Sequence, residues 1–174
     1  GMSGPGQGFV HATDATVPQL ARMAEDGTHI VWSPRSNLDL YDDTTAADVA
    51  LRLGVPVALG PDWTWSGSPN PAREMSCAYD FLATRESSIS DVDLFRMGTT
   101  DAARAVGLDG VVGSLVAGTA ADIAVFSFSR QPYQAVVESG PEDVLLTIIG
   151  GDALYGTSDL IDGLNSNPEW CEEV

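Results

Sequence analysis

The sequence predicts an α/β protein that begins with a segment of parallel sheet and continues into a small antiparallel β segment. Apolar runs at 28–33 and 55–62 have no polar alternation, which is typical of strands buried on both faces. Segments with helical spacing of apolar residues separate the strands, and strands joined through helices form parallel βαβ units. After Gly107 short β segments alternate with glycines, which favours antiparallel pairing.

The chain opens with a strand, a helix and a second strand. The first strand is short and is expected at 8–12. A helix follows at 17–26, with Pro18 in its first turn and Gly27 just after its last residue, the positions that these two residue types prefer. The buried strand at 28–33 completes the first βαβ unit.

A second βαβ unit follows directly. The polar segment 34–37 is expected to be a loop, and the acidic and hydroxyl residues at 42–45 are suited to capping a helix at 46–53. The strand at 55–62 comes next. It breaks at Gly60-Pro61 and ends on Asp62.

The second half contains more helices and then the antiparallel segment. Helices are expected at 70–85, 91–95 and 99–106, and strands at 121–126, 144–149 and 152–156. Gly150-Gly151 lies between the last two strands and predicts a hairpin. The predicted division is an α/β part at 1–107, a β part at 108–157 and a C-terminal tail at 158–174.

Composition excludes several classes of partner. The net charge is −17, and all eight basic residues are arginine. This charge repels nucleic acid and anionic membranes, and it resembles the surface of a salt-adapted protein. No apolar run approaches the ~20 residues of a membrane span, and residues 1–8 resemble neither a signal nor a transit peptide. We therefore expect a cytoplasmic protein, in which the widely separated Cys77 and Cys171 are reduced thiols.

Two residues at strand ends are candidates for chemistry. Asp62 lies where α/β folds place catalytic groups, but the same residue type also caps helices and closes turns. His11 can likewise be a site residue or a structural histidine. His29 enters its strand from the amino end and is expected to be structural, and Glu74 at a helix start is expected to be solvated or paired.

Several segments together resemble the amidohydrolase superfamily, in its branch of cytosine and guanine deaminases, adenosine-analogue deaminases and triazine hydrolases. The resemblance covers about 9–156 and is carried by Val10-His11, Val31-Trp32-Ser33-Pro34-Arg35-Ser36-Asn37-Leu38, Ala58-Leu59-Gly60-Pro61-Asp62-Trp63 and the segment 113–126. It implies a metal-dependent (β/α)8 TIM barrel, of which this chain holds the last three strands and their helices. It also implies that the antiparallel segment belongs to a composite β-sandwich.

The resemblance implies roles for individual residues. His11 and Asp62 match catalytic and metal-ligating positions, with Asp62 also passing protons and the metal being zinc or iron. Ser36 and Asn37 match a segment that shapes the floor of the substrate pocket. Trp63, beside Asp62, is a candidate to contact a planar substrate of purine or pyrimidine type, although aromatic residues near strand ends more often belong to the core.

The sequence also departs from the family pattern. It contains no His-x-His, no counterpart of the histidine on the fifth barrel strand, and no lysine. It therefore resembles the C-terminal part of such a deaminase-like hydrolase, with an incomplete site, and we expect no activity from the chain alone. Three hypotheses remain open: a fragment that works with a missing N-terminal half, a non-catalytic homo-oligomeric module, and a module that binds a small molecule without chemistry.

Overall fold

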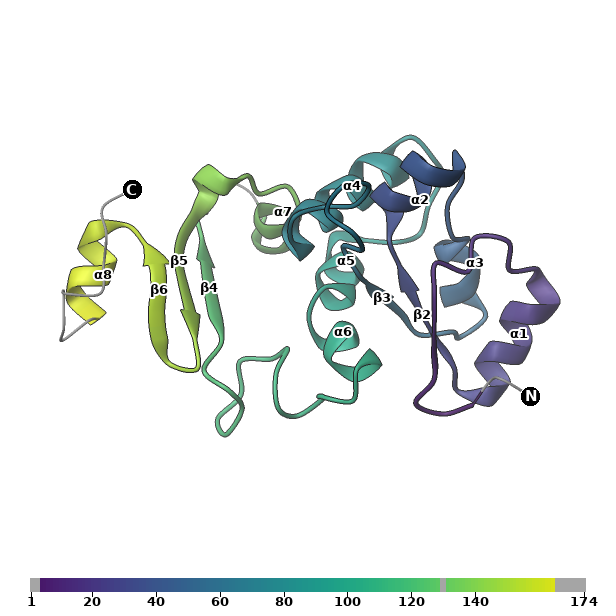
Figure 1. The fold of residues 1–174 in the computed structure, drawn as a ribbon, viewed down its shortest axis with the longest axis horizontal. Coiled ribbons are helices and arrows are strands. Elements are labelled where there is room, and N and C mark those ends of the chain that lie inside the picture. The colour runs from purple at the N-terminus through teal and green to yellow at the C-terminus, as the bar shows by residue number, and fades with distance from the viewer. Residues whose placement is uncertain (1–3, 129–130, 165–174) are drawn as a thin grey trace.

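The computed structural model describes residues 4–128 and 131–164, which form two separate sheets with helices between them. Figure 1 shows the parallel sheet and its helices at one end of the molecule and the antiparallel sheet at the other. The parallel sheet has the order β1-β2-β3 and consists of β1 (Gly8–Val10), β2 (His29–Trp32) and β3 (Val57–Leu59). The antiparallel sheet has the order β4-β5-β6 and consists of β4 (Ile123–Phe126), β5 (Val144–Ile149) and β6 (Asp152–Gly156).

Both predicted βαβ units are present, which confirms the parallel pairing. Helix α1 (Val17–Asp26) connects β1 to β2, while α2 (Pro34–Tyr41) and α3 (Ala47–Arg52) connect β2 to β3. The strand predicted at 55–62 is shorter than expected, because β3 ends at Leu59. Proline at position 61 has no N–H to donate to the ladder, so the chain turns out of the sheet before Asp62.

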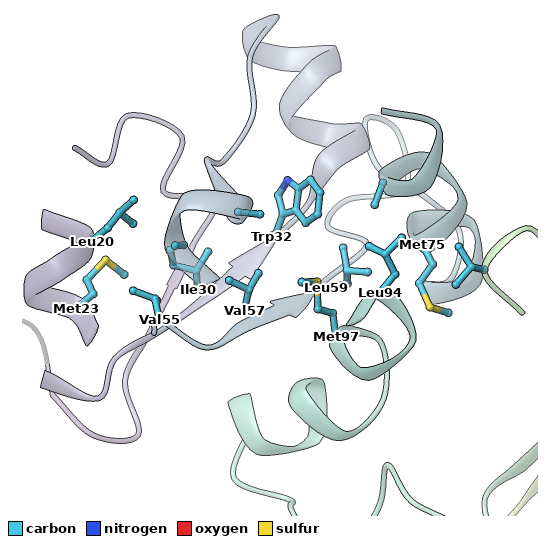
Figure 2. Packing of buried hydrophobic residues seen from close by; sticks show 14 residues of the cluster. Leu20, Met23, Ile30, Trp32, Val55, Val57, Leu59, Met75, Leu94 and Met97 are labelled. Carbon is cyan, nitrogen blue, oxygen red and sulfur yellow. The ribbon is translucent and has the colours of Figure 1, made fainter. Parts of the chain in front are cut away.

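The hydrophobic core lies against one face of the parallel sheet, the face that carries Ile30 and Trp32 of β2 and Val57 and Leu59 of β3. Figure 2 shows Leu20 and Met23 of α1 at one end of the cluster and residues of the later helices at the other, with strand side chains between them. Three helices follow β3, and all were predicted: α4 (Pro71–Ala83), α5 (Asp91–Met97) and α6 (Thr100–Ala105). Trp32 belongs to this core and is fully buried.

The segment expected to be a polar loop at 34–37 is instead the first turn of α2. Pro34 occupies the first turn of the helix, where its missing N–H costs nothing. The side chain of Glu74, far away in the sequence, accepts a hydrogen bond from the backbone N–H of Arg35 at 2.9 Å. This contact satisfies one of the unpaired N–H groups of the first turn. The prediction of a loop at 34–37 was wrong because local sequence does not show that Glu74, 39 residues away, accepts a hydrogen bond from Arg35.

The antiparallel part confirms the predicted hairpin. Strands β5 and β6 pair on either side of Gly150 and Gly151, whose φ angles of 61° and 95° favour glycine at both positions. Three short elements were not predicted: α7 (Pro132–Val137), a 3-10 helix η1 (Pro141–Asp143) and α8 (Ser158–Leu164). Helix α8 lies within the predicted tail at 158–174 and packs on β5 and β6, whereas Cys171 falls outside the described residues.

In the part of the chain that the structure describes, no helix is both long enough and apolar enough to span a bilayer.

Candidate active site

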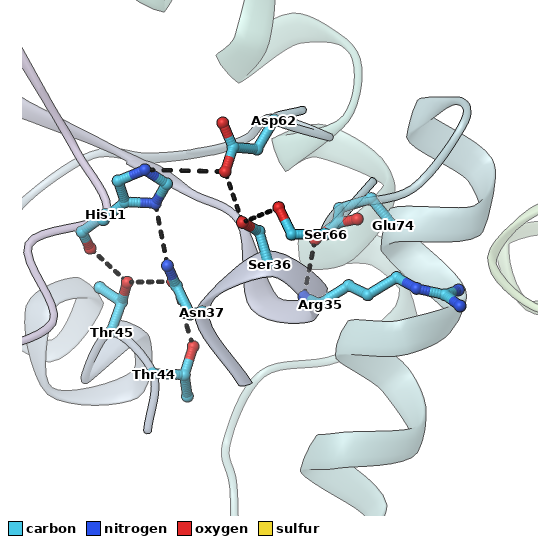
Figure 3. A network of polar contacts seen from close by, with 9 residues as sticks. All are labelled: His11, Arg35, Ser36, Asn37, Thr44, Thr45, Asp62, Ser66 and Glu74. Atoms are coloured by element: carbon cyan, nitrogen blue, oxygen red, sulfur yellow. Dashed lines mark hydrogen bonds and ion pairs between the residues drawn. The ribbon is translucent and has the colours of Figure 1, made fainter. Parts of the chain in front are cut away.

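Four polar residues meet at the carboxyl edge of the parallel sheet. His11 follows β1 directly, Ser36 and Asn37 lie in the first turn of α2 after β2, and Asp62 follows β3. Figure 3 shows their side chains converging from these three connections. The His11 Nε2 atom lies 3.8 Å from Asp62 Oδ2. The carboxyl edge is where parallel α/β folds bind ligands.

The backbone is strained at both candidate catalytic residues. His11 has a φ of 67°, Ala12 a φ of 51° and Asp62 a φ of 62°. The left-handed region costs a non-glycine residue of order 1–3 kcal/mol, and such residues gather at functional sites. Asp42, which ends α2, is the other non-glycine residue with positive φ in the described chain. These turns bring both side chains over the edge of the sheet toward each other.

The loop after β3 is held by a close backbone approach. The Gly67 N–H donates to the Trp63 carbonyl at 2.6 Å, and the Ser68 N–H donates to the Pro61 carbonyl at 3.2 Å. A Cβ atom at position 67 would lie 1.8 Å from the Pro61 oxygen, so only glycine fits there. The compact loop fixes the direction in which Asp62 leaves the sheet.

Asp62 is oriented by a buried serine. The Ser36 hydroxyl donates to Asp62 Oδ2 at 2.5 Å, and it lies 3.0 Å from the Ser66 hydroxyl. Ser36 is fully buried, whereas the Asp62 side chain is 27 % exposed. A charge-assisted hydrogen bond from a fixed donor restricts the rotamer of the carboxylate. The buried Ser36 therefore orients the Asp62 carboxylate, while the rest of the carboxylate stays accessible to solvent.

His11 is held by two partners. The Thr45 hydroxyl donates to the His11 backbone carbonyl, and the side-chain amide of Asn37 lies 2.9 Å from His11 Nδ1. Asn37 is fully buried, and its amide also contacts the hydroxyls of Thr44 and Thr45. The imidazole itself remains 25 % exposed, with the edge of the Tyr41 ring nearby.

Glu74 belongs to the support of the site and was missed from the sequence. It is fully buried, and burial raises the pKa of its carboxyl group, while the Ser68 hydroxyl and the Arg35 amide oppose the shift. Of the two alternatives expected for Glu74, solvated or paired, the structure shows the second, because the side chain is buried and accepts from the Arg35 N–H. Its spacing was the available signal, because Glu74 precedes the fully buried Ala78 by four residues, which is one turn on the same helix face.

Three tryptophan residues near the strand ends differ in burial. Trp32 is in the core and donates its indole N–H to Thr44 Oγ1 at 2.8 Å. Trp63 is 64 % exposed beside Asp62, and its ring lies 6.3 Å from that of the even more exposed Trp65. These two rings are thus at the surface of the site and not in the core.

The donors suit a divalent cation but are too few. An imidazole nitrogen and a carboxylate oxygen are zinc ligands, with bonds of about 2.0–2.2 Å, so atoms 3.8 Å apart can share one ion. A catalytic zinc site needs about three protein ligands. Among residues 4–128 and 131–164, no three histidine, cysteine, aspartate or glutamate side chains gather into a metal-binding group. The described residues therefore bring together two candidate ligands, fewer than a catalytic zinc site uses.

Residues 7–154 match the model of the Amidohydrolase family. The chain belongs to the amidohydrolase family. A relative, the 5-methylthioadenosine/S-adenosylhomocysteine deaminase of Teredinibacter turnerae, is 31 % identical over 131 residues, which are 73 % of this amidohydrolase chain and 30 % of the relative. The chain thus spans less than a third of that relative's length.

Solved structures agree with the fold. Guanine deaminase from E. coli superposes with a TM-score of 0.76 at 21 % identity, over 91 % of this amidohydrolase chain and 41 % of its own. A zinc-bound adenosine deaminase from Xanthomonas campestris gives a TM-score of 0.74 at 26 % identity, over 84 % and 36 %. The amidohydrolase fold is therefore shared with deaminases, and a homologous structure contains zinc.

Proposed function

We propose that this chain is the C-terminal part of a metal-dependent amidohydrolase barrel that hydrolyses C–N bonds in the manner of a deaminase. In this proposal β1, β2 and β3 are the last three barrel strands, and β4–β6 belong to a composite β-sandwich. The observation that carries the proposal is the approach of His11 and Asp62, both on strained backbone, at the carboxyl edge of the sheet. The site is completed by ligands that this sequence does not contain.

The residues present divide the chemistry between them. A zinc or iron ion held in part by His11 and Asp62 would supply water with a pKa lowered to ~7. Asp62 accepts a proton and passes it to the leaving amine, while Ser36 keeps the carboxylate oriented. His11 polarises the substrate, and the exposed Trp63 covers one face of a planar purine or pyrimidine-like ring.

The open edge of β1 is an observation that favours a partner segment beside this strand. In the described chain β1 pairs with β2 alone, Val10 is 57 % exposed, and a cavity of about 550 Å³ lined by β1, α1 and the turn between them adjoins His11. Three strands cannot close a barrel, and an uncovered strand edge invites pairing. We propose that a segment carrying the first barrel strands covers this edge.

Completing the barrel is the direct test. Co-expression with the N-terminal portion of the Teredinibacter turnerae deaminase is expected to give a complex that binds near-stoichiometric zinc or iron. The complex should also release ammonia from 5-methylthioadenosine. Elemental analysis and an ammonia assay measure the two properties. A His11→Ala, Asp62→Ala control should lose both. A well-folded complex without metal or ammonia release would count against the proposal.

Ser36 provides a graded test in the same complex. Replacing Ser36 with alanine removes the donor to Asp62 Oδ2 and leaves the carboxylate free to rotate. We expect zinc affinity to fall about 10–100-fold, the usual effect of losing a partner that orients a ligand. Competition against a zinc chelator measures this change. Equal zinc affinity in Ser36→Ala and the parent would show that Ser36 does not position Asp62.

The second candidate is a non-catalytic homo-oligomeric module. The free β1 edge and the incomplete ligand set of the described chain favour it. In that case the chain should self-associate at micromolar concentration and bind no metal. Light scattering coupled to size exclusion distinguishes the two, because a monomer that associates only with an N-terminal barrel segment supports the hydrolase.

A further inference from the structure

The hydroxyl of Thr45 has only one proton, and that proton can be donated to only one acceptor. The His11 backbone carbonyl can only accept a hydrogen bond, so the proton of Thr45 is committed to that carbonyl. The oxygen of Thr45 therefore faces the Asn37 side chain, 3.3 Å away, as an acceptor. Asn37 is fully buried, so each polar atom of its amide needs a partner in the protein.

The Asn37 amide has two orientations, related by a half-turn that exchanges its nitrogen and oxygen. With the nitrogen toward His11, as drawn in Figure 3, the Asn37 oxygen accepts from the Thr44 hydroxyl at 3.4 Å but meets the Thr45 oxygen without a proton between them. That orientation leaves one acceptor facing another in a buried site, which is unfavourable.

The opposite orientation satisfies every atom of the amide. The Asn37 nitrogen then has two protons for two acceptors, the hydroxyl oxygens of Thr44 and Thr45. Thr44 Oγ1 already accepts from the Trp32 indole and has a second lone pair to offer. The Asn37 oxygen faces His11 Nδ1 at 2.9 Å and must receive a proton from it.

We propose that Thr45 and Asn37 act as positioning residues that fix the tautomer of His11, placing its proton on Nδ1 and leaving Nε2 bare. The bare Nε2 then faces Asp62 Oδ2 at 3.8 Å, as one acceptor opposite another. Such a pair favours an electron-poor ligand between its atoms, either a metal cation or an N–H group of a substrate. This consequence for ligands rests on the proposed function, whereas the tautomer itself does not.

The test is nitrogen NMR of the ¹⁵N-labelled full chain, without metal or substrate. The chain has two histidines, so His29 serves as an internal reference. Spectra recorded at mildly alkaline pH report the tautomers of a neutral imidazole ring. Two-bond correlations to the ring protons then show which nitrogen of His11 is protonated. We expect Nδ1 to be protonated and Nε2 to be bare; a predominantly Nε2-protonated His11 would overturn the proposal.

Two variants separate the role of the hydroxyl from a general structural effect. Thr45→Val removes the hydroxyl at nearly constant volume, and it should raise the Nε2-protonated fraction of His11 several-fold. Thr45→Ser retains the hydroxyl and should keep the parent tautomer. The His29 resonances should match in all three proteins, which reports that each is folded. An unchanged His11 tautomer in a folded Thr45→Val variant would overturn the role of Thr45. If that variant does not fold, the tautomer of the parent chain still decides the proposal.

Discussion

An Asp62→Asn variant of the completed barrel is expected to lose about 10²–10⁴-fold in kcat, the range that a positioned proton-transfer group contributes. Asparagine has nearly the same shape as aspartate, and its carbonyl oxygen can still accept the hydrogen bond from Ser36. It also tolerates the left-handed backbone, with a φ of 62°, that strains most other residues at this position. The loss should therefore report the missing negative charge and proton acceptor, not a changed loop. Steady-state ammonia release measures it.

Asp39→Asn is the matched control, because Asp39 is exposed on the same helix that carries Ser36 and lies outside the site. It removes the same charge from the surface and should leave kcat within twofold of the parent. An Asp62→Asn enzyme with activity equal to that of Asp39→Asn would exclude Asp62 from proton transfer.

Glu74→Gln is expected to stabilise the chain by roughly 1–3 kcal/mol at neutral pH, the cost of leaving buried polar groups unpaired. In the described residues, Glu74 Oε2 and Ser68 Oγ are buried and make no hydrogen bond of normal geometry. Glutamine keeps the oxygen that accepts from the Arg35 N–H, and it adds an amide donor that can reach Ser68. It also removes a buried charge. Urea unfolding at pH 7.5 measures the change.

The gain from Glu74→Gln should depend on pH in a definite direction. Burial raises the pKa of Glu74 above its ordinary value of 4.5, so in the intervening range the folded state binds more protons than the unfolded state. The stability contributed by the protonated carboxyl is complete below pH 4.5 and is lost as the pH rises through the folded-state pKa. The glutamine variant lacks this loss, so its advantage should grow with pH and then level off. An advantage that is equal at all pH values would contradict a raised pKa.

Glu74→Ala is the companion variant for the same experiment. Alanine removes the buried charge but also leaves the Arg35 N–H without its acceptor and opens a cavity. It should therefore be less stable than Glu74→Gln at every pH. The comparison separates the cost of the charge from the value of the hydrogen bond that holds the start of α2.

The sequence by itself determined the order of the six strands and of helices α1 and α3 to α6, and it determined the edge at which the candidate site forms. Apolar runs locate β2 and β3, and helical spacing of apolar residues locates α1. Each pattern can be seen locally, because a strand buried on both faces is apolar throughout and a helix buried on one face is apolar at every third or fourth residue. Parallel βαβ units bring the ends of successive strands to one edge, so His11 and Asp62 could be expected there together.

The tertiary structure decided what surrounds those two residues. The first turn of α2 has the composition of a loop, and it is helical in a fold where Glu74 accepts from Arg35 across 39 residues of sequence. Ser36 reaches Asp62 across 26 residues, and Asn37 reaches His11 across the same separation. Such partners meet only after the sheet has formed, and a hydrogen bond depends on distance and direction in space. Local composition therefore located the two catalytic candidates, but only the packed fold could reveal the buried residues that orient them.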